Sequence, residues 1–116
     1  MTPDELQART KAFALRVIKL VAALPGTVLG RTMGAQLLRA ATSVGANYRA
    51  ARRARSKREF IAKICIVVEE ADESAYWLDL IADGGLIPKP RIQPLYNEAM
   101  ELTRIFAAAR QTATGR

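Results

Sequence analysis

Ten residues near the middle of the chain carry its most concentrated chemistry. The segment 49–58 reads Arg-Ala-Ala-Arg-Arg-Ala-Arg-Ser-Lys-Arg, so six of its ten residues are basic and none is acidic. Guanidinium groups suit bidentate contacts with phosphates, and each phosphate that they neutralise releases counterions. The block is therefore a candidate nucleic-acid-binding site. Its six cations are Arg49, Arg52, Arg53, Arg55, Lys57 and Arg58.

Two other interpretations of this basic block stay open. Its cations can pair with an acidic protein partner, or they can form a solvated surface without a partner. An acidic partner can be a second copy of this chain, which offers the carboxylates of Glu69, Asp72, Glu73 and Asp79. Tyr48 precedes the block and can stack on a base, although a single tyrosine on a helix more often packs in the core.

The net charge of +7 is unevenly distributed along the 116 residues. Residues 1–63 hold 13 Lys and Arg against three acids, whereas residues 64–116 hold five against eight. A basic half favours nucleic acid, an acidic protein or an anionic membrane surface as a partner. The one cysteine, Cys65, excludes an internal disulfide. Its apolar neighbours predict a buried, inert thiol, which fits a reducing cytoplasm.

Enzymatic and metal chemistry is not expected from this composition. The chain has no histidine, which is the commonest general base and zinc ligand, and it has no P-loop and no G-x-G-x-x-G motif. Glu70 and Glu73 lie three apart, but the Glu-x-x-His pattern of bundle metal sites is missing. We therefore expect no enzyme activity, metal or cofactor. The acidic start and the lack of a ~20-residue apolar run predict neither a signal peptide nor a membrane span.

Hydrophobic spacing and end signals predict four helices, at about 3–24, 28–54, 57–83 and 91–112. Thr2 with Glu5, and Ser56 with Glu59, have the spacing of capping boxes, and Gly84-Gly85 is a stop signal. Short connections then predict an all-α, antiparallel up-and-down four-helix bundle, with residues 1–116 as a single domain.

The second predicted helix carries unusually small side chains over much of its circumference. Gly34 and Gly45 lie inside it, and because an internal glycine costs about 1 kcal/mol relative to alanine, we expect another helix to approach closely there. On the third helix, Glu70 lies near the buried seam and needs a partner. We expect it to pair with Arg39 or to bond Asn47, both on the second helix; the alternative is that its carboxylate extends into water.

The predicted helices place the basic block at one end of the bundle. Arg49, Arg52 and Arg53 share a face at i, i+3 and i+4, while the other three cations surround the turn into the third helix. The block is thus partly on a rigid element.

Three segments resemble the bacterial four-helix bundle family, also called the 23S rRNA intervening-sequence protein or ribosomal protein S-twenty-three family. They are Gln36-Leu-Leu-Arg-Ala-Ala-Thr-Ser-Val-Gly-Ala-Asn47, Ser56-Lys-Arg-Glu-Phe60 and Glu69-Glu-Ala-Asp-Glu-Ser-Ala-Tyr-Trp-Leu78. The resemblance implies a homopentameric ring of bundles. It extends to the accessory variability protein of diversity-generating retroelements, a basic pentamer that binds reverse transcriptase and nucleic acid. It implies no catalytic residues, and structural roles for Arg39, Ser43 and Asn47.

One departure from the family pattern falls within the basic block. Where the family commonly continues after Asn47 with an Ile-Ala-Glu-Gly-like segment, this chain reads Tyr48-Arg-Ala-Ala-Arg-Arg53. The acid and the glycine are missing, and the segment has gained arginines. We therefore expect a cytoplasmic, non-enzymatic homo-oligomer that binds RNA or DNA through this block, or an adaptor that docks an acidic protein such as a reverse-transcriptase-like or ribosome-associated partner.

Overall fold

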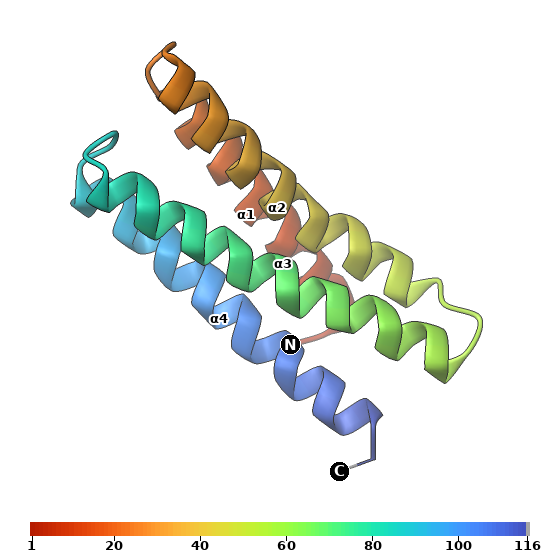
Figure 1. Cartoon of the computed structure of the whole chain (residues 1–116). Helices are drawn as coiled ribbons and strands as arrows, with labels where there is room; N and C mark the ends of the chain where they lie inside the picture. The colour runs from red at the N-terminus through yellow and green to blue at the C-terminus, as the bar shows by residue number, and fades with distance from the viewer. Residues whose placement is uncertain (116) are drawn as a thin grey trace.

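The computed structural model describes residues 1–115 and contains four helices within them: α1 (Pro3–Ala22), α2 (Val28–Arg52), α3 (Lys57–Asp83) and α4 (Lys89–Ala113). Consecutive helices run antiparallel and pack side by side, and α1 also contacts α4 (Figure 1). The molecule measures 44 × 21 × 20 Å. The all-α prediction is confirmed. α1 and α2 end two residues earlier than expected, and α4 begins two residues earlier.

Side-chain caps explain where the first three helices begin. Thr2 and Glu5 form the expected capping box, and its hydrogen bonds lower the pKa of the Glu5 carboxyl. Thr27 accepts a hydrogen bond from the backbone of Gly30 at the start of α2. Ser56 caps α3, because its hydroxyl oxygen accepts a hydrogen bond from the Glu59 backbone N–H. The second bond of a capping box, from the Ser56 backbone N–H to the Glu59 carboxylate, does not form within residues 1–115.

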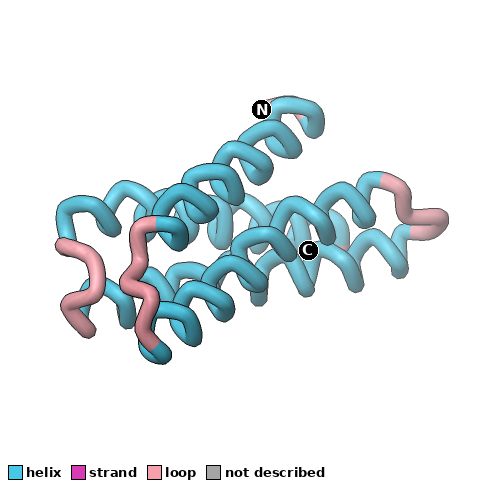
Figure 2. The backbone as a smooth tube through the Cα atoms, turned by 90° about the horizontal axis from the view of Figure 1, so that it is seen from above, coloured by secondary structure: helices cyan, strands magenta, loops and turns pink. Residues whose placement is uncertain are grey.

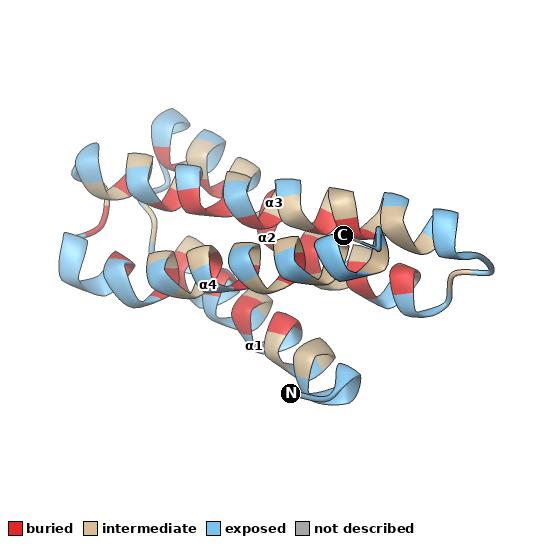
Figure 3. Cartoon of the chain, turned by 90° about the horizontal axis from the view of Figure 1, so that it is seen from below, coloured by how far each residue is buried: buried red, intermediate tan, exposed pale blue. Residues whose placement is uncertain are grey.

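The core is a cluster of buried apolar residues between the four helices, and Figure 3 shows buried residues on their facing sides. It contains most of the residues expected from the helical spacing, including Phe13, Leu37, Leu78 and Phe106. Cys65 is only half-buried, which corrects the expectation of a buried thiol. The helical spacing puts Val67 rather than Cys65 on the fully buried side of α3.

Glycines let α1 and α2 approach each other closely, as the sequence predicts. A Cβ added to Gly34 would lie 3.0 Å from Leu24 Cδ1 and 3.1 Å from Val21 Cγ1. A Cβ added to Gly45 would lie 3.2 Å from Thr10 Oγ1. Gly30 is tighter still, because its Cβ would overlap the backbone carbonyl of Pro25. Gly34 and Gly45 therefore set the spacing of the two helices, and Gly30 sets the turn between them.

The first half of α1 leans away from the other three helices (Figure 2). A bidentate ion pair ties it to α4: Arg9 donates from Nε to Glu98 Oε2 at 2.7 Å and from Nη2 to Oε1 at 2.8 Å. The hydrogen bond to Glu98 raises the pKa of Arg9. Both side chains are largely shielded from water, so this ion pair holds α1 against α4 more firmly than an exposed surface pair would.

Arg39 of α2 binds the carboxylates of α3, as expected for Glu70. Its guanidinium lies 3.3 Å from Glu70 Oε1 and also bonds Glu73, which in turn accepts from Trp77 Nε1 at 2.9 Å. The alternative, a bond between Glu70 and Asn47, is wrong: Asn47 donates to the backbone carbonyl of Ser43 at 2.9 Å. The side chain therefore bonds within its own helix and does not bridge α2 to α3.

We predict that Gly30→Ala destabilises the fold by about 1–2 kcal/mol. The backbone carbonyl of Pro25 cannot move aside cheaply, so strain of about 1–3 kcal/mol exceeds the helix propensity that alanine gains. Urea unfolding measures the change. Gly26→Ala is the matched control, since nothing lies within 4 Å of its added Cβ. Equal stability of the two variants would contradict the close approach.

We predict that Glu70→Gln lowers the free energy of unfolding by about 0.5–1 kcal/mol, because Arg39 loses one of two carboxylate partners on a partly exposed surface. A double-mutant cycle with Arg39→Gln isolates the coupling. Asp72→Asn, an exposed charge change on the same helix, serves as the control. A coupling energy of zero would show that the pair does not help to hold α2 against α3.

Candidate nucleic-acid interface

The turn between α2 and α3 forms one end of the molecule and extends beyond the start of α1 (Figures 1 and 2). α2 ends at Arg52, α3 begins at Lys57, and Ser56 fixes the entry of α3. The structure thus brings the six predicted cations together at this end. We call the exposed set at the turn the basic patch: Arg49, Arg53, Arg55, Lys57 and Arg58.

None of the five patch residues forms an ion pair within residues 1–115. The sixth predicted cation differs from them. Arg52 donates from Nη2 to Asp4 Oδ1 at 2.7 Å and from Nη1 to Gln7 Oε1 at 2.6 Å. It therefore fastens the first turn of α1 to the end of α2, a contact between residues 48 positions apart that sequence spacing does not show.

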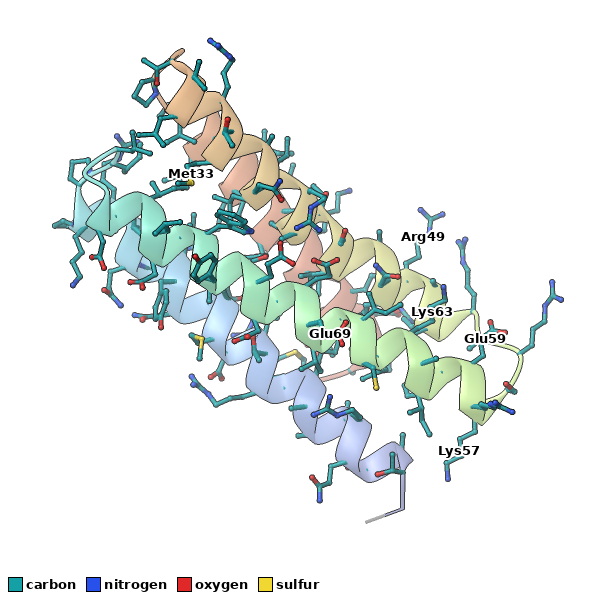
Figure 4. All side chains as sticks on the ribbon, viewed as in Figure 1. Met33, Arg49, Lys57, Glu59, Lys63 and Glu69 are labelled. Atoms are coloured by element: carbon teal, nitrogen blue, oxygen red, sulfur yellow. The ribbon has the colours of Figure 1, made fainter. Side chains whose placement is uncertain are left out.

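Two hollows flank the C-terminal part of α2. One, of about 650 Å³, lies between α1 and α2 and is lined by Lys11, Arg49 and Arg52 among others. The second, of about 410 Å³, lies between α2 and α3 and is lined by Arg49, Arg53, Arg55, Glu59 and Lys63. Arg49 borders both hollows and projects from α2 (Figure 4). Both hollows carry more positive than negative side chains.

The structure excludes Tyr48 as a stacking platform for a base. Its side chain is buried, and its ring packs edge-on against Phe106 with 5.0 Å between ring centroids. Burial raises the pKa of its hydroxyl group. Tyr48 is a core residue that joins α2 to α4, in keeping with the more common role of a lone helical tyrosine.

Sequence reasoning missed two cations that lie beside the patch. Lys63 follows Glu59 by one helical turn and lines the hollow between α2 and α3, so its helical spacing was a usable signal. Lys11 reaches the groove between α1 and α2 only because the chain folds back. No local pattern connects it with Arg49, which is 38 residues away.

The outer face of α3 carries the acids that were proposed to contact a neighbouring copy. Glu69, Asp72 and Asp79 are exposed and form no ion pair within residues 1–115. Glu73 is already held by Arg39 and Trp77 of its own chain. Three of the four predicted acids are therefore unpaired within residues 1–115, and they lie away from the basic patch on the same helix (Figure 4 labels Glu69).

No helix within residues 1–115 is both long enough and apolar enough to cross a membrane. No group of three or more His, Cys, Asp or Glu side chains in residues 1–115 could hold a metal ion.

Comparison with known proteins agrees with the sequence resemblance. Residues 5–108 match the family described as 23S rRNA-intervening sequence protein. No curated protein matches the chain. Among solved structures, a protein of unknown function from the S23 ribosomal protein family of Bacteroides thetaiotaomicron superposes with a TM-score of 0.85. It is 30% identical, and the match covers 90% of this chain and 97% of that one. The protein therefore belongs to the 23S rRNA-intervening sequence protein family.

Proposed function

We propose that this protein is a non-enzymatic homo-oligomer of helical bundles that binds nucleic acid, RNA or DNA, through the basic patch. One observation carries the proposal. The five patch cations have no carboxylate partner within residues 1–115, whereas Arg9, Arg52 and Arg104 each bind one and Arg39 binds two. Other arginines such as Arg16 and Arg91 are also unpaired, but the α2–α3 turn concentrates five unpaired cations within ten residues of the chain.

The patch geometry suits phosphates for two reasons. Four of its five members are arginines, whose planar forks match phosphate oxygens and keep their charge at any physiological pH. Their like charges repel one another on the end of a rigid hairpin, and an anion that bridges them relieves this repulsion. A polyanion gains further from the release of its condensed counterions.

Charge complementarity and the family resemblance support the proposal of a homo-oligomer. The patch and the acidic face of α3 carry opposite charges and lie apart on one chain, so patch-to-face contact between copies is heterologous and can close into a ring. A pentamer is the ring size that the resemblance implies. We also assign the protein to the cytoplasm, because its single cysteine cannot form an internal disulfide.

An acidic protein partner is the second candidate function. The same free cations favour it, since they can pair with a cluster of carboxylates as well as with phosphates. Purification from cell extract distinguishes the two, because an adaptor retains a protein partner and shows little affinity for RNA or DNA.

We predict that the double variant Arg53→Gln/Arg55→Gln binds short RNA and DNA duplexes more weakly than the parent protein. Loss of two phosphate contacts lowers the slope of log affinity against log salt by about 2. Fluorescence anisotropy at several salt concentrations measures both quantities.

The matched control is Arg16→Gln/Arg91→Gln, which removes the same charge from exposed arginines that border a separate hollow between α1 and α4. It should change the slope much less. Equal losses in the two double variants would contradict a localised site, and no binding by the parent protein at low salt would overturn the proposed function.

A further inference from the structure

The groove between α1 and α2 has the composition of an anion-binding site. Its volume of about 650 Å³ falls within the ~300–1,000 Å³ of ordinary ligand sites. Lys11 on one wall faces Arg49 and Arg52 on the other. Its small lining residues let a ligand approach the backbone closely, namely Ala8, Ala14, Gly45 and Ala46.

The charged groups that this groove leaves without a partner are cations. The hydroxyl of Thr10 donates to the carbonyl of Gln7 at 2.7 Å, and that of Thr42 donates to the carbonyl of Leu38 at 2.7 Å. The one carboxylate in the lining, Asp4, is paired with Arg52. Lys11 and Arg49 form no ion pair within residues 1–115 and are the unpaired charges of the groove.

We infer that this groove is a phosphate subsite, in which Lys11 and Arg49 hold a backbone phosphate of the nucleic acid and Asp4 competes with phosphate for Arg52. The inference rests on the proposed function and extends the bound path from the α2–α3 turn onto α1. Arg49 joins the two parts, because it borders the groove as well as the hollow beside the turn.

Asp4 is suited to be a displaceable competitor. Its side chain is 88% exposed, so water solvates the carboxylate as soon as it leaves Arg52. An exposed ion pair of this kind opposes displacement by only a small factor, about fivefold or less. The contact therefore tunes affinity for phosphate and does not block the groove, and binding loosens the first turn of α1 from α2.

The first test compares Lys11→Gln with Lys19→Gln, using anisotropy of short labelled RNA and DNA duplexes. Both lysines are exposed on α1, but Lys19 borders the separate hollow with Arg16 and Arg91. Lys11→Gln should lower the salt slope by about 1, and Lys19→Gln should leave it nearly unchanged. Equal slopes for both variants would remove Lys11 from the site.

The second test compares Asp4→Asn with Glu5→Gln, which makes the same charge change in the same helical turn while glutamine keeps the capping box. Asp4→Asn should raise duplex affinity about two- to fivefold more than Glu5→Gln does. In an Arg52→Gln background this difference should vanish. A difference that persists there would show that Asp4 acts through general charge and not through Arg52.

The outcomes separate the inference from the proposed function. If the parent protein binds duplexes and Arg53→Gln/Arg55→Gln weakens binding while Lys11 and Asp4 variants match their controls, the groove subsite is wrong and the patch stands. If no protein of the set binds either duplex at low salt, the function and the subsite both fall.

Discussion

The close approach of α1 and α2 is the constraint on which the rest of the structure depends. Glycine at positions 34 and 45 permits this approach, because an added Cβ would come within 3.0–3.2 Å of the side chains of Leu24, Val21 and Thr10. Because α1 is held against α2 there, the α1–α2 groove forms beside the end of α2. The bidentate pair of Arg9 and Glu98 then fixes the leaning first half of α1 against α4.

Charge is used in two different ways along this frame. Three arginines join neighbouring helices through ion pairs: Arg9 with α4, Arg39 with α3 and Arg52 with α1. Each such pair is a modest contribution on a partly wet surface, but together they connect neighbouring helices around the bundle. The arginines of the basic patch form no ion pair within residues 1–115. Their charge is therefore available to a partner, and the repulsion among them favours one that is anionic.

The fold can be predicted from local sequence signals, whereas the candidate site can be predicted only in part. Thr2 and Ser56 mark helix starts, and the apolar spacing of residues such as Leu37 and Leu78 marks the buried face, because caps and periodicity are properties of short segments. The cation cluster and the Arg39–Glu70 pair were predictable from helix register. The capture of Arg52 by Asp4 was not, since the lean of α1 that brings them together depends on packing over the whole molecule.

The central claim is that copies of this bundle assemble and bind nucleic acid at their basic ends. Size-exclusion chromatography with light scattering, with absorbance read for protein and for nucleic acid, tests both parts on protein purified at low salt. The account predicts a discrete oligomer, and the family resemblance implies a pentamer. The mass of this oligomer should rise when a duplex is added and fall back at high salt. A monomer whose mass and absorbance ratio do not change with added duplex would contradict it.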